Sequence, residues 1–449
     1  MSSSSCARAR SVSTADEQSL RPWLAQLAAT GRLVEIAEEL DPASGLAARL
    51  VSHRREPARI ARVRGSDLPI VANLLPSRAL IAEALGVAER DLGDHLQRAL
   101  AAPLGEQISR DAPCQEIVVE PDPDLAQLPI PRFFEHEGGP YITAGCIVTR
   151  DPETGARNWS IARVRPLGGA RALVGIAPNH HLAVAARAAR ERGERLPIAV
   201  TIGNHPALMI AACFYLARGE DELLVAAALL GEPVALARCK RVPLEVPAGC
   251  EIVLEGELDL DATVEEGPVS EFHGGYERYG HAATATFHCL TRRRDALYQA
   301  ILPGFHPEHT LIGGVAIAAG LERRLRGLVP AVRAVAVPES GAGRLSAVVA
   351  LGPHEPGDAL TAARATLSAV NLVKLVTVVD DDVEVWDDAA VAHAVATRVH
   401  FDRDLHVLPG MRADRAEPLE REGTIAKLAI DATRHAGDRD DWTPAEPPP

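Results

Sequence analysis

The stretch VEEGPVSEFHGGY, residues 264–276, places Glu266 and Glu271 in a segment rich in glycine and proline. It follows EIVLEGELDL (251–260), whose alternating apolar and acidic residues predict a half-buried strand. On a regular strand, side chains five residues apart point to opposite faces, and on a helix they lie about 140° apart. A turn through the Gly-Pro pair is free of both restrictions and could direct both carboxylates to one site. The residues alone also allow an ordinary acidic surface loop.

Three further groups of polar residues stand near the ends of predicted elements. NWSIAR (158–163) places an amide, a hydroxyl and a guanidinium on one short strand. PNHH (178–181) precedes a predicted helix, for which Asn179 is a plausible N-cap. Glu222 lies in the first turn of another predicted helix, where the helix dipole favours a carboxylate in any case. Each group has an ordinary structural explanation, so none identifies a site alone.

Two other motifs point only weakly to ligands. GGVAIAAGLERRL (313–325) has spaced glycines before a predicted helix, but it lacks the GxGxxG order of a dinucleotide site. The three aspartates 380–382 end a predicted strand and could hold a cation, although acidic strand ends are usually solvated. We favour the structural interpretation of both.

Length and composition restrict the class of protein. A chain of 449 residues exceeds one ordinary core, and a net charge of −14 argues against a nucleic-acid-binding surface. No apolar run reaches membrane-spanning length, and the N-terminus has no apolar signal-peptide core. The seven scattered cysteines lack any CxxC, which suits a reducing cytoplasm. We therefore expect a cytoplasmic protein that binds neither nucleic acid nor membrane, with disordered tails at 1–18 and 437–449.

The pattern of elements predicts an α/β (α+β) protein. Helical and strand-like stretches alternate from 19 to about 110, and again from 310 to 436. Between about 137 and 300 the predicted strands are longer and their turns richer in glycine, with a few helices between them. This middle part is typical of a mainly antiparallel barrel or sandwich.

Taken together, these stretches resemble the UbiD family of prenylated-FMN-dependent decarboxylases, over about residues 19–430. Eight segments carry the resemblance, in the family's order: LPIP…EGGPYITAG (128–145), RNWSIAR (157–163), PNHH (178–181), LPIAVTIGNHP (196–206), DELLVAAALLGEPV (221–234), VPAGCEIVLEGEL (246–258), EEGPVSEFHGGY (265–276) and KLVTVVDDDVEV (374–385).

The resemblance implies a metal and flavin site. Asn158, His180 and Glu222 match the family's ligands of a divalent ion that bridges to the flavin phosphate, and these ligands suit Mn²⁺ or Mg²⁺. The family also places K⁺ nearby, although CFYLARGED departs here from the commoner proline-containing version. Lys374 resembles a lysine that pairs with the phosphate. The implied cofactor-binding residues are Asn158, Ser160, Ile161, Arg163, Asn179, His180, Glu222 and Lys374.

Arg163, Glu266 and Glu271 match the family's Glu-Arg-Glu network. An arginine offers a charge-assisted anchor for an acid substrate, and Glu271 is our expected proton donor, tuned through Arg163 by Glu266. Crowding and burial should raise the pKa of this donor. Because Asn158 and Arg163 lie five residues apart, one shared site requires a bulge, strong twist or strand end between them.

By resemblance the domains are an N-terminal α/β domain (19–115), a split β-barrel domain related to flavin reductases (116–308), a hinge helix (309–330) and a C-terminal α/β domain (331–436) that forms a homodimer. The implied activity is reversible decarboxylation of an unsaturated, aromatic or heteroaromatic acid, with a flavin prenyltransferase as cofactor supplier. Two alternatives remain: a metal-dependent hydrolase, and a non-catalytic flavin-binding subunit of a multicomponent decarboxylase.

Overall fold

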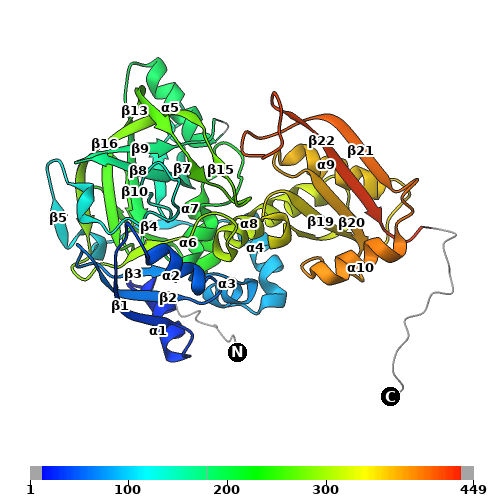
Figure 1. Cartoon of the computed structure of the whole chain (residues 1–449), viewed down its shortest axis with the longest axis horizontal. Helices are drawn as coiled ribbons and strands as arrows, with labels where there is room; N and C mark the ends of the chain where they lie inside the picture. The colour runs from blue at the N-terminus through cyan, green and yellow to red at the C-terminus, as the bar shows by residue number, and fades with distance from the viewer. Residues whose placement is uncertain (1–12, 179, 436–449) are drawn as a thin grey trace, which may run out of the picture. The chain divides into compact units, whose positions relative to one another are not determined.

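The computed structural model describes residues 13–178 and 180–435, and the chain divides between Ile317 and Ala318 into two compact units. Sheets and helices occur in both units, so the predicted mixture of α and β structure is confirmed (Figure 1). None of the described helices is long and apolar enough to cross a membrane. The described α-helices are α1 (Arg21–Ala29), α2 (Leu46–Ser52), α3 (Arg78–Ala84), α4 (Leu92–Ala101), α5 (His181–Glu191), α6 (Pro206–Ala211), α7 (Glu222–Leu230), α8 (Pro307–Arg326), α9 (Asp358–Ala369) and α10 (Asp388–Arg398).

An eight-stranded sheet dominates the first unit, and its main path is antiparallel throughout, as the sequence predicts. The path runs β7-β6-β10-β13-β16-β9-β8, and β5 pairs with β16 beside it. Although β7 and β8 are the two ends of this path, only Ala162 separates them in the chain. The sheet therefore curls until its ends meet. Its strands are β5 (Ile117–Val119), β6 (Cys146–Arg150), β7 (Arg157–Ile161), β8 (Arg163–Gly168), β9 (Arg171–Gly175), β10 (Leu196–Ile202), β13 (Ile252–Glu266) and β16 (Gly280–Arg292).

Three smaller sheets complete this unit. The N-terminal sheet has the order β1-β2-β3-β17 and confirms the early alternation of strands and helices. The hairpin β14–β15 carries Glu271 in its turn. The strands of these sheets are β1 (Val34–Leu40), β2 (Ala58–Val63), β3 (Ile70–Ala72) and β17 (Tyr298–Ala300); β12 (Glu245–Pro247), β11 (Val234–Arg238) and β4 (Glu106–Ile108); and β14 (Val269–Ser270) and β15 (Tyr276–Glu277).

The alanine-rich face of α5 packs into the curled sheet. Ala185, Ala186 and Ala189 are buried in one core cluster with side chains of β6, β10, β13 and β16. Because alanine is small, the helix backbone can lie close to the strands. This packing fixes the position of His180, which immediately precedes α5.

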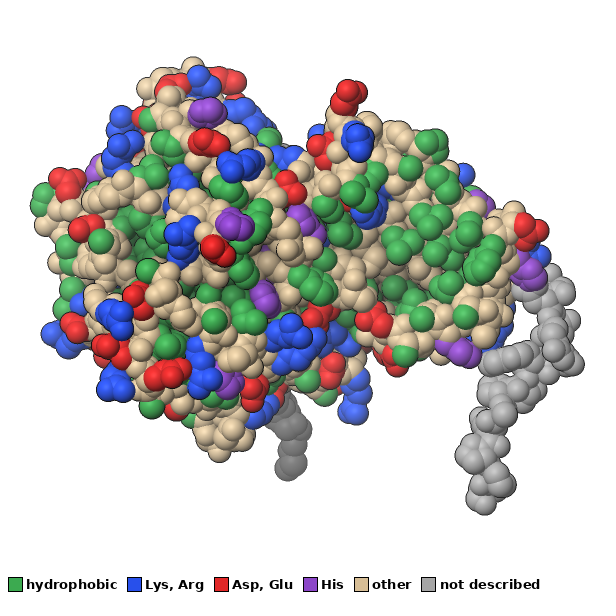
Figure 2. All heavy atoms as spheres, in the orientation of Figure 1, with side chains coloured by type: hydrophobic (Ala, Val, Ile, Leu, Met, Phe, Trp, Pro, Cys, Tyr) green, Lys and Arg blue, Asp and Glu red, His purple; other side chains and the backbone are tan. Residues whose placement is uncertain are grey.

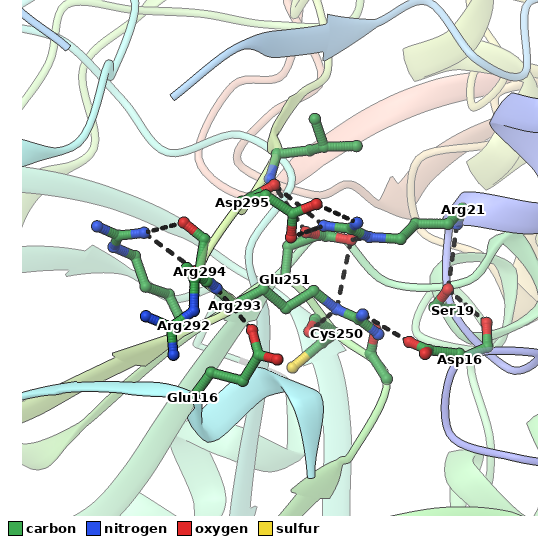
Figure 3. A network of polar contacts seen from close by, with 12 residues as sticks. Asp16, Ser19, Arg21, Glu116, Cys250, Glu251, Arg292, Arg293, Arg294 and Asp295 are labelled. Atoms are coloured by element: carbon green, nitrogen blue, oxygen red, sulfur yellow. Dashed lines mark hydrogen bonds and ion pairs between the residues drawn. The ribbon is translucent and has the colours of Figure 1, made fainter. Parts of the chain in front are cut away.

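A polar network ties the beginning of the described chain to the eight-stranded sheet (Figure 3). Arg21 Nε donates a hydrogen bond to Oε1 of the fully buried Glu251 at 2.9 Å, and Arg293 Nη1 donates one to Asp16 Oδ1 at 2.6 Å. Gln18 Nε2 also donates to the Pro233 carbonyl at 2.9 Å. Residues 13–18 therefore belong to the folded chain, which corrects the expected tail at 1–18. Residues 1–12 and the expected tail 437–449 lie outside the described residues.

The second unit has one five-stranded sheet of order β18-β19-β20-β22-β21 with α9 and α10. β20 pairs in parallel with both β19 and β22, which agrees with the alternation predicted for 310–436. β21 is an edge strand. The strands are β18 (Val332–Ala336), β19 (Ser346–Leu351), β20 (Leu375–Asp380), β21 (Leu405–Arg412) and β22 (Thr424–Ala432).

Candidate active site

Arg163 lies between the two carboxylates that the sequence singled out. Its Nη1 is 2.8 Å from Glu271 Oε1, and its Nε and Nη2 are 3.2 and 3.1 Å from Glu266 Oε1. The carboxylate side chains are buried, with 1% of Glu266 and 8% of Glu271 exposed, whereas 28% of the Arg163 side chain is exposed. The guanidinium is thus held by both carboxylates, while part of the Arg163 side chain stays exposed.

The strand end expected between Asn158 and Arg163 is present. β7 ends at Ile161 and β8 begins at Arg163, so Ala162 interrupts the alternation of side chains. The two residues therefore stand on different strands rather than on opposite faces of one strand.

The placement of Glu266 in a loop is wrong. β13 continues to Glu266, which pairs with Gly280 of β16, and a register shift between Asp259 and Thr263 interrupts the earlier pairing. The turn begins at Gly267, whose φ is +118° and whose Cβ, if present, would lie 2.9 Å from the Glu277 carbonyl oxygen. Glycine is therefore required at this turn.

Gly175 of β9 is a site residue that the sequence analysis missed. A Cβ there would lie 2.2 Å from Glu266 Oε1 and 3.2 Å from Arg163 Nε. Gly175 also pairs directly with Arg163 across β8 and β9. The signal was a glycine inside the apolar stretch ALVGIA (172–177), because glycine in a strand often marks a close approach.

The expected rise in the pKa of Glu271 is wrong. Burial acts to raise this pKa, but the positive charge of Arg163, a hydrogen bond from Tyr279 and the charge of His309 together outweigh it. The pKa of Glu271 is therefore lowered. Burial and the charge of Glu271 raise the pKa of Tyr279, so its hydroxyl remains a donor. In the protein alone, Glu271 is an ionised carboxylate at neutral pH.

Glu137 supports the hairpin that carries Glu271, and sequence reasoning missed it as well. Its buried carboxylate accepts the backbone N–H groups of Phe133 (3.1 Å) and Phe134 (3.2 Å) through Oε2. Its Oε1 accepts the Ser270 hydroxyl at 2.6 Å, one residue before Glu271. Nothing in the local sequence signals this contact, because the partners are 133 residues apart.

Two of the three predicted metal ligands are joined through Trp159. Its backbone N–H donates to Glu222 Oε2 at 2.9 Å, which brings the first turn of α7 against β7 beside Asn158. Both Asn158 and Glu222 are buried, and burial raises the pKa of Glu222 to about 7. Ser160, which also belongs to the predicted cofactor set, donates its hydroxyl to Asn158 Oδ1 at 3.3 Å. Ile161 is the last residue of this strand.

His180 is itself the N-cap residue of α5 and makes no side-chain cap bond. Its imidazole lies edge-on to Tyr215, with ring centroids 6.2 Å apart. Asn179, predicted both as N-cap and as cofactor contact, lies outside the described residues. Within the described residues, no three His, Cys, Asp or Glu side chains form a metal-binding group; the predicted set has only two such side chains.

The remaining candidates lie in the second unit or on α8. Lys374 precedes β20 and forms an ion pair with the buried Glu417. Of the three aspartates 380–382, Asp380 and Asp382 are paired with Arg398 at 3.1 and 2.9 Å. The glycines of 313–325 lie inside α8 rather than in a loop before a helix, which excludes a phosphate-binding turn there.

Family models match nearly the whole chain. Residues 24–100, 106–306 and 310–432 match the N-terminal, Rift-related and C-terminal domains, respectively, of 3-octaprenyl-4-hydroxybenzoate carboxy-lyase. The anhydromevalonate phosphate decarboxylases of Methanothermobacter thermautotrophicus and Methanosarcina mazei are 33% and 34% identical to this chain. Each match covers 92% of this chain and 96% of the relative.

Comparison with solved structures also finds UbiD-class enzymes and a decarboxylase. The UbiD-class enzyme HmfF from Pelotomaculum thermopropionicum, in complex with FMN, superimposes with a TM-score of 0.90 at 34% identity, covering 95% of this chain and 97% of that one. An evolved dimeric form of HmfF in complex with prenylated FMN gives 0.87 at 33% identity, with 96% and 97% covered. Vanillic acid decarboxylase from Sedimentibacter hydroxybenzoicus gives 0.87 at 26% identity, with 96% of each chain covered. The chain therefore belongs to the UbiD family and is a carboxy-lyase, a decarboxylase like the relatives it matches.

Proposed function

We propose that this carboxy-lyase removes CO₂ from an unsaturated, aromatic or heteroaromatic acid with prenylated FMN, and that Arg163 binds the acid. The observation that carries the proposal is the position of Arg163. Glu266 and Glu271 hold its guanidinium, and 28% of its side chain is exposed. A guanidinium held in this way can offer its remaining N–H groups to a carboxylate.

Glu271 is the proposed proton donor, and its lowered pKa defines how it would work. When an anionic substrate binds Arg163, it adds a negative charge beside Glu271 and compensates part of the arginine's charge. Both changes raise the pKa of Glu271 in the complex, so the carboxylate takes up a proton as substrate binds. That proton is then available at Glu271 when CO₂ has left. Glu266, bonded to the same guanidinium, keeps Arg163 in place throughout.

The cofactor proposal follows the structural neighbours, which bind FMN or prenylated FMN. Bound prenylated FMN would supply the electron sink for C–C cleavage, which none of the three network side chains can provide. The chain's own residues would bind the acid, orient it and deliver a proton. The proposed contacts are Asn158, Ser160, Ile161, Arg163, Asn179, His180, Glu222 and Lys374.

A divalent ion fits Asn158, His180 and Glu222. An amide oxygen, an imidazole and a carboxylate suit Mn²⁺ or Mg²⁺ when phosphate and water oxygens complete the shell. The buried Glu222 has a raised pKa, which means that its charge is poorly compensated by the protein alone. A cation beside it would supply the missing compensation. K⁺ near the same glutamate is a further proposal from the family resemblance.

For the domains, we propose that the curled sheet is the split β-barrel of the flavin domain (116–308). The N-terminal domain (19–115) precedes it in the chain, and the C-terminal domain (331–436), which follows the hinge helix (309–330), forms the homodimer. A flavin prenyltransferase would supply the cofactor.

The class of acid that serves as substrate is best identified by testing a panel of acids. The decarboxylase relatives named for anhydromevalonate phosphate add phosphorylated unsaturated aliphatic acids to the compact aromatic and heteroaromatic acids favoured by the family resemblance. CO₂ release should be measured on all three classes with cofactor-loaded protein. We expect the wild type to release CO₂ from at least one class. In the R163K control, the rate of CO₂ release should be at least about 10²-fold lower. Binding of the flavin without release from any class would instead favour a non-catalytic flavin-binding subunit, and metal-dependent hydrolysis without flavin would favour the hydrolase alternative.

A further inference from the structure

Tyr279 contacts every member of the Arg163–Glu266–Glu271 network. The centre of its ring is 5.0 Å from Arg163 Cζ. Its hydroxyl hydrogen-bonds the Glu271 carboxylate. Its backbone N–H donates to the Glu266 carbonyl at 3.2 Å. One residue thus joins the anchor, the proposed proton donor and the end of β13.

The position of Tyr279 is fixed by packing. It lies directly before β16 and packs against a small apolar cluster that includes Tyr141, Leu173, Val269 and Ala282. Val269 belongs to the strand that leads to Glu271, so the same cluster orients both ends of the hairpin. A tyrosine held in this way presents a ring face to a cation and a hydroxyl to an anion at the same time.

We propose that Tyr279 is a positioning residue of the active site: its hydroxyl holds the Glu271 carboxylate in place, and its ring supports the Arg163 guanidinium. This proposal rests on the proposed function of the network. The two contacts have separate consequences, because the hydroxyl acts on the proton donor and the ring acts on the substrate anchor.

Removing the hydroxyl changes the balance of charges around Glu271 in a known direction. Besides the backbone N–H of Phe272, the groups that face this carboxylate are Arg163 from β8, Tyr279 from the segment before β16, and His309 from α8. All three favour its ionised form, and burial opposes them. Without the hydroxyl, the ionised form loses one donor, so the pKa of Glu271 must rise.

The direct test is a titration of Glu271 in the protein without cofactor. Infrared difference spectra against E271Q assign the carboxyl band of this residue, and its pH dependence is followed in the wild type and in Y279F. A hydrogen bond to a charged group corresponds to about one pH unit, so the Glu271 pKa should rise by about that much in Y279F. An unchanged Glu271 pKa would overturn the proposal.

Y141F is the matched control. Tyr141 is buried in the same cluster and its ring lies 5.9 Å from Arg165 Cζ, so it too is a tyrosine beside an arginine. Among the described residues, however, its hydroxyl has no hydrogen-bond partner. Y141F should leave the Glu271 pKa unchanged. A shift equal to that of Y279F would mean that any nearby ring substitution has this effect, and would also overturn the proposal.

Cofactor-loaded enzyme gives a second readout that separates hydroxyl from ring. Because the donor form persists to higher pH in Y279F, the alkaline limb of its kcat profile should move up by the same amount, with KM little changed. Y279L also removes the ring and should raise KM as the anchor loses its support. Equal effects of both variants on KM would contradict the separate roles. If even the wild type releases no CO₂, the proposed function fails, while the titration still decides the role of Tyr279.

Discussion

Arg163 is useful because two carboxylates hold its guanidinium while part of its side chain stays exposed. Both Glu266 and Glu271 are almost fully buried, and a charge buried without a partner is costly, so the arginine and the carboxylates hold one another in place. The exposed part of the Arg163 side chain is the part that a substrate can reach.

At this scale we expect E271Q to lower kcat by at least about 10²-fold while flavin occupancy stays at the wild-type level. The amide cannot deliver the proton, but it removes none of the proposed cofactor contacts. Turnover with cofactor-loaded protein and the flavin absorbance spectrum measure the two effects.

E265Q is the control for this variant. Glu265 neighbours Glu266 but is exposed, and its carboxylate faces Arg278 at 3.4 Å. It should keep its activity. A wild-type rate in E271Q would contradict the assignment of the proton donor.

Gly175 gives a second prediction at the residue scale. In G175A the new methyl group would occupy the position of Glu266 Oε1, so the carboxylate must move and Arg163 loses part of its grip. We expect at least about a tenfold loss in kcat/KM, which corresponds to about 1.4 kcal/mol. Steady-state kinetics on the loaded enzyme measure it.

G93A in α4 is its counterpart, because nothing lies within 4 Å of a Cβ at that position. It should leave kcat/KM unchanged. Equal kinetics for G175A and the wild type would show that the close approach has no functional role.

At the scale of elements, the site depends on where strands and helices end. β7 brings Asn158 to the first turn of α7, α5 begins immediately after His180, and β13 ends at Glu266. The three predicted metal ligands therefore come from three different elements. Their alignment requires the curled sheet and both helices to be intact.

We expect H180A and E222A each to lower bound Mn²⁺ and flavin occupancy together, since the proposed ion links the phosphate to the protein. Metal analysis and flavin absorbance on the same sample measure both quantities. A roughly tenfold weaker metal affinity or more is expected from the loss of one ligand.

H181A changes the adjacent imidazole, which is outside the predicted set, and it should keep both metal and flavin. Full flavin occupancy in metal-free H180A would refute the shared site.

The sequence predicted elements better than it predicted their ends. α5 and α7 follow from their apolar patterns, and the interruption between Asn158 and Arg163 was required by the alternation of a strand. Glu266 was misplaced because the acidic, glycine-bounded end of β13 reads locally as a loop, whereas its pairing with Gly280 is a tertiary contact. Gly175 had a local signal, a glycine within a strand, but its partners and the role of Glu137 depend on long-range contacts that no local pattern gives.

The predicted rise in the pKa of Glu271 was wrong for a related reason. Burial and a second carboxylate were visible in the sequence as expectations, and both act to raise a carboxyl pKa. The opposing contacts from Tyr279 and His309 come from separate parts of the fold. The sign of the shift was therefore decided by the charge of Arg163, which the motif named, together with contacts from Tyr279 and His309, which no motif named.

At the scale of the whole molecule, the second unit presents apolar side chains to solvent. Leu405 and Val407 on the edge strand β21 are 36% and 67% exposed, and Phe401 just before it is 67% exposed. Hydrophobic side chains gather on the visible face of this unit around β20–β22 (Figure 2). Exposed apolar edges of this kind commonly mark contacts between chains.

We expect a homodimer that V407D weakens at least about tenfold in dissociation constant, because a charge would be buried in the contact. Light scattering over micromolar concentrations measures the assembly state. V118D places the same charge on an exposed strand of the first unit, where Val118 is 44% exposed, and it should leave the dimer intact. A wild-type monomer throughout this range would contradict the prediction.

The central claim is that the Arg163–Glu266–Glu271 network delivers a proton but depends on a flavin-derived electron sink. General acid catalysis supplies only about 10²–10⁴-fold, which falls far short of the acceleration that enzymes commonly provide. The most direct measurement compares CO₂ release by protein expressed without a flavin prenyltransferase, with added FMN, and after reconstitution with reduced prenylated FMN followed by oxygen. We predict activity only in the third sample. Decarboxylation at a comparable rate by cofactor-free or FMN-loaded protein would contradict the account.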